Sequence, residues 1–452
     1  MNKYFGTDGF RGVAGVELTA ERAFRIGRYL GHYLKENKET DRPRVVIGKD
    51  TRLSCYMLEY AIASGLAASG ADVSLMHVTT TPCVTYITVR DSFDFGVMIT
   101  ASHNPFMDNG IKIIDSHGEK IDDTLASLIE RYIDNNILKD IPYAIGADVG
   151  RIIDYSLGRD EYTEHLSSLA SHSYSTLRIG IDTANGSATK IAREVFERLG
   201  ATVYQIGDEP NGLNANDCCG STHPKKLANV VKKNQLDLGF AFDGDADRCI
   251  AIDHEGNIVD GDRMLYLFTK RMLRQNTLAT DTVVATVMSN GGIVTSLADL
   301  GVKVDLTKVG DRFVYERMQE LGGNLGGEQS GHIILKKYAT TGDGIITAIM
   351  ILEEIMDTAC SLSELTKGLT VYPQISRSIR VKNKEDAISD PDLARLIARI
   401  KENNLSRGRL LVRASGTEPA IRIMAEDANE EICKKCIDEM TSFLTNRGYT
   451  DE

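Results

Sequence analysis

The sequence predicts an α/β protein in which three related units with mixed or parallel sheets are followed by a smaller α+β domain. Over about the first 360 residues, apolar runs of strand length alternate with stretches of helical periodicity, which is the rhythm of βαβ units. In the rest of the chain, strand-like runs follow one another across short turns, which favours antiparallel pairing. The two patterns together predict several compact domains in one chain.

The elements of the first unit are predicted from apolar runs and from the glycines that end them. A strand is expected at 44–50, a helix ending in glycine at 56–70, and a second strand at 71–76. Two further strands are expected at 95–100 and 110–114, on either side of a polar loop. Strands that alternate with helices in this way predict a largely parallel sheet with helices on both faces.

The same rhythm restarts twice before the pattern changes. A strand, a helix and a strand are expected within 178–207, a buried strand at 236–242, and the same plan again within 282–308. The last segment predicts three strands and two helices, at 376–382, 409–415, 420–426, 392–403 and 429–445. We therefore expect four domains, with the bounds 1–150, 151–255, 256–368 and 369–452.

Composition narrows the classes of function. The chain has 452 residues, a net charge of −12 and 42% hydrophobic residues, values typical of a folded protein with a sizeable core. No apolar run reaches the ~18 residues of a membrane helix, and the acidic balance argues against nucleic acid or an anionic membrane as partner. We expect a cytoplasmic protein with a small-molecule ligand. The eight scattered cysteines predict no disulfide framework, and Cys433 and Cys436 are expected to pack within a helix.

A run of carboxylates follows the predicted strand at 236–242. Asp243, Asp245 and Asp247 stand at every second position, so their side chains can converge on one hard cation such as Mg²⁺. Loops at the carboxyl ends of strands are also where α/β sheets place ligands. The alternative is a solvated acidic turn, and we favour metal binding.

A serine and a histidine follow the strand at 95–100. Ser102 is expected in an exposed loop next to His103, where it could act as a nucleophile. The serine-hydrolase elbow Gly-x-Ser-x-Gly is absent, which disfavours acyl transfer. The alternative is that Ser102 only fixes a turn before Pro105.

Two further loops carry polar groups suited to a phosphorylated ligand. The stretch RASGTEP (413–419), together with Arg422, supplies guanidinium groups, hydroxyls and free backbone N–H groups for a phosphate. The stretch GGEQSGH (326–332) presents polar side chains between glycines, as a hydroxylated ligand requires, although a polar hairpin would look similar.

The motifs TASHNP, FDGDADR, GEQSGH and RASGTEP, in this order and about a domain apart, resemble those of the α-D-phosphohexomutases. The opening FGTDGFRG and the stretch NGLNANDCCGSTHP make the likeness closer to members that act on glucosamine phosphates. The likeness covers the whole chain. It implies a heart-shaped protein of four domains around a central cleft, the fourth resembling the TATA-binding protein.

The resemblance also implies a reaction. Ser102 would carry a phosphoryl group and pass it to glucosamine 6-phosphate, and the 1,6-bisphosphate would turn round and release glucosamine 1-phosphate for UDP-N-acetylglucosamine and peptidoglycan precursors. One Mg²⁺ per chain and a 1,6-bisphosphate of glucosamine or glucose as activator are the cofactors it implies, and a homodimer is compatible with it.

Residue roles follow from the same resemblance. The implied metal ligands are a phosphoserine oxygen at Ser102 with Asp243, Asp245 and Asp247. The implied catalytic groups besides Ser102 are His103, Lys112, Arg11 and Arg248. The implied substrate-binding residues are Glu328, Ser330, His332, Arg413, Ser415, Gly416, Thr417 and Arg422. Lys112 could instead be a simple surface lysine.

Three alternatives stay open. A mutase of the same family could act on glucose or mannose phosphates. A haloacid-dehalogenase-like phosphatase also places Asp-x-Asp after a strand, and Asp243 would then be the nucleophile. A sugar-phosphate sensor would bind without turnover.

Overall fold

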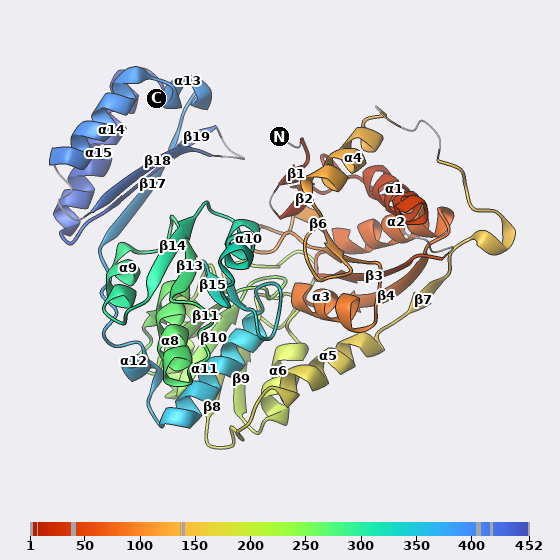
Figure 1. Ribbon diagram of the computed structural model, residues 1–452, viewed down its shortest axis with the longest axis horizontal. Helices are drawn as coiled ribbons and strands as arrows, with labels where there is room; N and C mark the ends of the chain where they lie inside the picture. Colours follow the sequence, from red (N-terminus) through yellow and green to blue (C-terminus); the bar gives the residue numbers. More distant parts are fainter. Residues whose placement is uncertain are drawn as a thin grey trace. The chain divides into compact units, whose positions relative to one another are not determined.

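The computed structural model describes residues 3–6, 8–37, 42–135, 137, 141–403, 408–415 and 419–450. The chain divides into two compact units (Figure 1), one made of Met1–Met288 with Val304–Lys367 and the other of Ser289–Lys303 with Gly368–Glu452. The first unit holds three of the four sheets. None of the helices among the described residues is long and apolar enough to cross a membrane.

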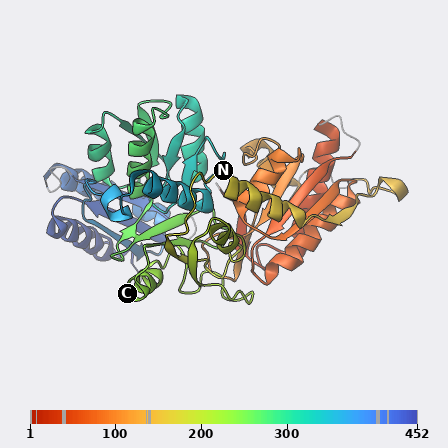
Figure 2. The same cartoon turned by 90° about the horizontal axis from the view of Figure 1, so that it is seen from below.

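The first sheet has seven strands in the order β1-β2-β6-β5-β3-β4-β7. Its strands are β1 (Phe5–Gly6), β2 (Gly9–Val13), β3 (Arg44–Lys49), β4 (Asp72–Val78), β5 (Phe95–Ile99), β6 (Asp108–Asp115) and β7 (Ile152–Asp154). Helices α1 (Ala20–Asn37), α2 (Ser54–Ala68), α3 (Thr81–Arg90) and α4 (Asp123–Ile133) flank it on both faces (Figure 1 and Figure 2). The apolar positions of β3 and β5 are buried in one core with those of α1 and α2.

The strands in the first sheet are parallel only in part. β3, β4, β5 and β7 run parallel, whereas β6, β2 and β1 pair antiparallel at the other side. The sheet also continues past residue 151, because β7 pairs with β4.

The second sheet has the order β12-β11-β10-β8-β9, and the third has the order β14-β13-β15-β16. The second consists of β8 (Arg178–Asp182), β9 (Thr202–Ile206), β10 (Leu238–Phe242), β11 (Cys249–Asp253) and β12 (Ile258–Val259), with α5 (Leu157–Ser168), α6 (Ile191–Arg198) and α7 (Lys225–Asn234). The third consists of β13 (Thr282–Thr286), β14 (Lys303–Thr307), β15 (Leu325–Gly327) and β16 (Ile333–Leu335), with α8 (Gly261–Arg274), α10 (Asp311–Leu321), α11 (Gly344–Thr358) and α12 (Leu362–Leu365).

One arrangement recurs in all three sheets. A strand that is parallel to its inner neighbour turns back into an antiparallel partner: β5 into β6, β10 into β11 and β15 into β16. These three turns are the TASHNP, FDGDADR and GEQSGH loops. The predicted three related units of mixed or parallel sheet are confirmed, and each carries one polar motif at the same turn.

The second unit contains a three-stranded antiparallel sheet in the order β17-β19-β18, as the short turns predict. Its elements are α9 (Gly291–Ala298), β17 (Gln374–Arg380), α13 (Lys384–Ile388), α14 (Pro391–Asn403), β18 (Arg409–Ala414), β19 (Ala420–Glu426) and α15 (Glu430–Asn446). Cys433 and Cys436 lie buried on α15 in the core of this unit. Both cysteines are therefore packing residues, as expected.

Candidate active site

Three carboxylates meet in the turn between β10 and β11. The buried strand LGFAF ends at Phe242, and Asp243, Asp245 and Asp247 follow with their side chains buried. One oxygen from each lies within 4.8 Å of the others. Spacing by two residues thus brings the three carboxylates to one point, as the sequence predicted.

The donor set fits a hard divalent cation. Asp245 Oδ1 and Asp247 Oδ1 are buried and have no hydrogen-bond partner within the described part of the chain. Burial, and then the charges of Asp247 and Asp245, raise the pKa of Asp243 well above its usual range. Because three buried carboxylates converge and the pKa of Asp243 is raised by burial and by the charges of the other two, a cation such as Mg²⁺ would relieve the repulsion at this point.

Ser102 lies directly against this cluster. It follows β5, and its Oγ donates a hydrogen bond to Asp243 Oδ2 at 2.6 Å while lying 3.2 Å from His103 Nδ1. Its φ of 50° is left-handed, which non-glycine residues rarely adopt outside functional turns. The expectation of an exposed loop is wrong, since Ser102 is 0% exposed. The Ser102 carbonyl packs so closely on Gly244 that a Cβ there would come within 2.6 Å of it.

Arg52, whose side chain is completely buried, binds the backbone of the loop that contains Ser102, which we call the serine loop. Its Nη2 donates to the carbonyls of Ser102 and Asn104 at 2.9 and 2.8 Å, and its Nη1 donates to the Asp108 carbonyl at 3.0 Å. Its Nε donates to Asp50 Oδ2 at 2.8 Å. A planar guanidinium can satisfy so many acceptors at once, whereas an ammonium cannot.

Arg52→Lys is therefore expected to loosen the serine loop although it keeps the charge. We expect the free energy of unfolding to fall by about 2 kcal/mol or more, and kcat to fall, because several charge-assisted hydrogen bonds are lost. Thermal melts and steady-state kinetics measure the two effects. Arg90→Lys, at the surface beside Glu161, is the control and should change neither. Unchanged kcat in a folded Arg52→Lys protein would contradict the role of Arg52 in positioning the serine loop.

Two cationic side chains lie beside the carboxylates, and a third, Arg11, is linked to them through Asp8 and Lys112. Lys112, on β6, is 2% exposed rather than a surface lysine, and its Nζ lies 2.8 Å from Asp245 Oδ2 and 3.1 Å from Asp247 Oδ2. Arg248 Nε lies 3.9 Å from Asp247 Oδ1, and Arg11 pairs with Asp8. The Nε atoms of Arg11 and Arg248 are buried without a hydrogen-bond partner in the described residues. These donors suit the oxygens of a phosphoryl group.

His103 is held in its neutral form. Burial, and then the charges of Arg248 and Arg11, lower its pKa to about 4. By contrast, the charges of Asp245, Asp247 and Asp8 outweigh burial at Lys112 and raise its pKa. Near neutral pH, His103 can therefore accept a proton, and Lys112 carries one.

The β15–β16 turn brings further polar groups to the cluster. Glu328 is buried, and its Oε1 accepts a hydrogen bond from Gly310 N at 3.0 Å, whereas Ser330 is exposed. His332 lies between two carboxylates, with Nδ1 3.8 Å from Asp247 Oδ1 and Nε2 3.6 Å from Asp311 Oδ2. The Gly342 N–H donates to His332 Nε2 at 3.0 Å. Because that nitrogen accepts, the ring can carry its proton on Nδ1, toward Asp247.

The predicted phosphate loop lies in the second unit, at the β18–β19 turn. Arg413 and Arg422 are directly opposite each other across the two strands. Partial burial and the charge of Arg422 lower the pKa of Arg413, which means that the two cations repel each other. Ser415 is buried, and its carbonyl accepts from Lys384 Nζ at 2.9 Å. Gly416 and Thr417 lie outside the described residues.

Several residues near the site were not singled out from the sequence. Asp8 belongs to the FGTDGFRG stretch, but the sequence analysis assigned it no role. Arg52, Lys120 and Asp311 lie in no motif that would have pointed to the site. Asn216, within NGLNANDCCGSTHP, donates through Nδ2 to the Ser102 carbonyl at 2.8 Å. Each of these residues contacts a side chain or carbonyl of the site from a segment that is distant in the sequence or lies on another element.

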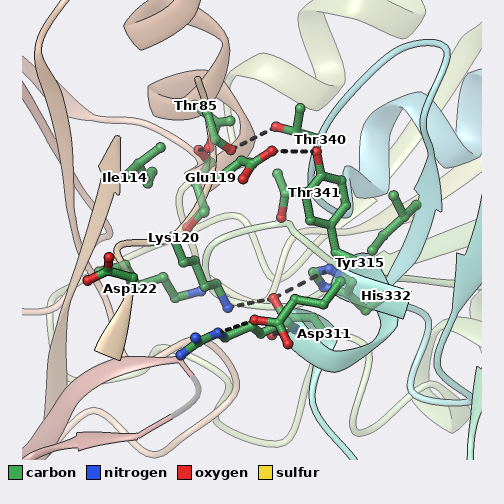
Figure 3. A pocket seen from close by; sticks show the side chains of 16 residues that line it. Thr85, Ile114, Glu119, Lys120, Asp122, Asp311, Tyr315, His332, Thr340 and Thr341 are labelled. Carbon is green, nitrogen blue, oxygen red and sulfur yellow. Dashed lines mark hydrogen bonds and ion pairs between the residues drawn. The ribbon is translucent and has the colours of Figure 1, made fainter. Parts of the chain in front are cut away.

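A cavity of about 190 Å³ adjoins the cluster within the first unit (Figure 3). Lys112, Lys120 and His332 line it together with Asp311. Figure 3 shows Lys120 and His332 both directed at Asp311. A chamber with polar groups on its wall beside a candidate metal site is typical of the active site of an enzyme.

Family comparisons agree with this geometry. Four models of phosphoglucomutase/phosphomannomutase match in order: the α/β/α domains I, II and III at residues 2–140, 160–256 and 260–372, and the C-terminal domain at 378–442. The matches cover most of the chain. The protein belongs to the phosphoglucomutase/phosphomannomutase family.

Individual relatives narrow the comparison. The chain is 48% identical over 449 residues to phosphoglucosamine mutase of Lachnospira eligens, covering 99% of this chain and 100% of that one. It is 46% identical to phosphoglucosamine mutase of Bacillus cereus, covering 96% of both.

Two solved structures share the fold. A phosphoglucomutase/phosphomannomutase family protein from Burkholderia thailandensis has a TM-score of 0.79 at 24% identity, covering 99% of this chain and 98% of that one. N-acetylphosphoglucosamine mutase from Aspergillus fumigatus, solved with GlcNAc-6P and magnesium, has a TM-score of 0.69 at 18% identity, covering 98% and 95%.

Proposed function

We propose that this chain is a phosphoglucosamine mutase, an isomerase that interconverts glucosamine 6-phosphate and glucosamine 1-phosphate. The observation that carries the proposal is Ser102 Oγ, 2.6 Å from the first of three buried, converging carboxylates. The full-length likeness to phosphoglucosamine mutases supports the choice of substrate. The reaction would use a phosphoserine at Ser102 and a 1,6-bisphosphate intermediate.

In the first transfer, the bond between the Ser102 Oγ and phosphorus breaks while a sugar hydroxyl oxygen bonds to the same phosphorus. The hydroxyl proton goes to a nearby base, for which His103 is a candidate because its lowered pKa leaves the imidazole unprotonated near neutral pH. Charged Lys112 can give a proton to the leaving Ser102 oxygen. The bisphosphate then turns round, and its other phosphoryl group returns to Ser102.

Phosphoryl transfer depends on positioning and charge neutralisation more than on covalent assistance. Asp243, Asp245 and Asp247, with an oxygen of phosphorylated Ser102, would hold one Mg²⁺, which supplies Lewis-acid neutralisation of charge when bound. Arg11 and Arg248 would bind the equatorial phosphoryl oxygens through their unpartnered Nε atoms.

The remaining roles concern the sugar and its second phosphate. Glu328 and Ser330 would bind sugar hydroxyls, and His332 would assist them from the carboxylate cluster. In the second unit, Arg413, Ser415, Gly416, Thr417 and Arg422 would bind the phosphate that is not being transferred. The repulsion between the two opposed guanidiniums supports this role, because a dianion would relieve it.

Arg413→Ala is expected to raise KM by roughly ten- to a hundredfold, since a charge-assisted contact is worth ~1.5–3 kcal/mol. It should also release bisphosphate before the second transfer, because the same group holds the intermediate. Steady-state kinetics with assay of free bisphosphate measures both. Arg377→Ala, whose guanidinium pairs with Asp438 instead, is the matched control. Unchanged KM in a destabilised Arg413→Ala protein would mean that the loop is only a turn.

The substrate choice is tested by initial rates on glucosamine, glucose and mannose 6-phosphates, with a 1,6-bisphosphate supplied as the activator we propose. Faster turnover of glucosamine 6-phosphate is the expected result. A preference for glucose or mannose phosphate would assign the chain to the other activity in the family name. With the amino sugar as substrate, we place the reaction in the cytoplasm, where its product feeds UDP-N-acetylglucosamine and peptidoglycan precursor synthesis. A homodimer is compatible with this proposal.

A further inference from the structure

Lys120 connects two carboxylates from different sheets of the first unit. It lies in the hairpin of residues 115–121 that follows β6, and its Nζ is 2.7 Å from Asp8 Oδ1 and 2.6 Å from Asp311 Oδ2. Asp8 precedes β2 of the first sheet, whereas Asp311 begins α10 beside the third. Burial opposes the charge on Lys120, but Asp311 and Asp8 outweigh it and raise its pKa. The ammonium is therefore charged and held between them.

Asp8 also contacts two cationic side chains that lie nearer to the candidate reaction centre. It pairs with Arg11 through Oδ2, and its Oδ1 lies 3.4 Å from Lys112 Nζ. Lys112 in turn contacts Asp245 and Asp247 at 2.8 and 3.1 Å. Alternating charges thus run without a gap from Asp311 to the metal-binding carboxylates.

The hairpin of residues 115–121 also packs against α10 and Thr340 through hydrogen bonds that do not involve these charged residues. Glu119 Oε1 accepts hydrogen bonds from Tyr315 at 2.9 Å and from Gln319 at 2.8 Å, both on α10. Thr340 Oγ1 donates to the Gly118 carbonyl at 2.7 Å. In Figure 3, Glu119 and Thr340 lie at the opposite end of the cavity from the Lys120–Asp311 pair. Docking and charge positioning can therefore be separated by mutation.

We propose that Lys120 is a positioning residue for phosphoryl transfer, which acts through Asp8 to keep Arg11 and Lys112 in place. Its ammonium binds Asp8 and Asp311, at one remove from Ser102 and the three aspartates. Without the Lys120 ammonium, the cationic partners left to Asp8 among the described residues would be Arg11 and Lys112, and Asp8 would draw Lys112 away from Asp245 and Asp247. Asp8 and Asp311 would also face each other without the cation between them.

The inference rests on the mutase activity proposed above and is tested on the full-length chain. Lys120→Met keeps most of the side-chain volume and removes the charge. We expect kcat to fall about tenfold or more with KM changed less than about threefold, as for residues that orient catalytic groups indirectly. Glu119→Gln, which weakens the docking contacts alone, should keep kcat near the wild-type value even if its melting temperature falls.

A double-mutant cycle identifies the route of the effect. If Lys120 acts through Asp8, Lys120→Met should lower kcat much less in an Asp8→Asn background than in the wild type. Additive losses, or a wild-type kcat in Lys120→Met, would overturn the proposal. Should Lys120→Met fail to fold, Lys120→Met with Asp311→Asn removes the opposing carboxylate too and is judged by the same kcat criterion. Absence of mutase activity in the wild type would instead refute the proposed function.

Discussion

Ser102→Ala should abolish mutase activity, to below about one thousandth of the wild-type kcat, and should remove the enzyme-bound phosphate. No other nucleophilic hydroxyl that the structure describes donates to Asp243. The substitution removes one oxygen whose bonds run to Asp243 and His103, so the fold should survive. Intact-protein mass spectrometry and kinetics on the same samples measure phosphate content and turnover together.

The control for this experiment is Ser74→Ala, which removes another buried serine hydroxyl on β4, outside the site. It should retain both phosphate and activity. A Ser102→Ala protein that is still phosphorylated and still isomerises substrate would exclude Ser102 as the carrier. Hydroxylamine would then show whether Asp243 carries the phosphoryl group instead, because it cleaves an acyl phosphate and leaves a phosphoserine intact.

The alternation of strand and helix was enough to predict three related α/β units, because the period of apolar residues directly reflects burial. It could not predict which strands run antiparallel. β6 and β11 are buried like the parallel strands beside them, and only the short connection from β5 or β10 distinguishes them. β7 escaped prediction for a related reason: its three residues are all exposed at the edge of the sheet.

The candidate site was predictable where its residues sit at strand ends. Ser102 and the three aspartates follow buried strands, and the structure brings them together as that placement predicts. Arg52 and Lys120 could not be found in this way, since a single arginine or lysine in a sequence carries no sign of its partners. Their contacts with the Ser102 carbonyl and with Asp311 join segments 50 and 191 residues apart.

Asp245→Asn should weaken Mg²⁺ binding and slow phosphoryl transfer, by roughly 10- to 100-fold in affinity or activity. The substitution removes one anionic oxygen from a site suited to a hard cation, while an amide oxygen can still accept from Thr81 and Lys112. Calorimetric titration with Mg²⁺ and kinetics at several Mg²⁺ concentrations measure the change. Chelator should inactivate the wild type, and added Mg²⁺ should restore it.

Melting temperatures with and without Mg²⁺ provide an independent test of the metal site. Without metal, Asp245 pairs with Lys112 but also repels Asp243 and Asp247. Because the amide oxygen of Asp245→Asn can keep the hydrogen bond from Lys112 while the repulsion is lost, the variant should melt at the same temperature as the wild type or higher in chelator. With Mg²⁺ the order should reverse, because only tight binding to the folded state stabilises it, by ~2.7 kcal/mol at a hundred times Kd. Asp253→Asn, a buried aspartate at the far end of β11, should show no such reversal. A wild type that is fully active and equally stable with and without metal would mean that the three carboxylates are structural.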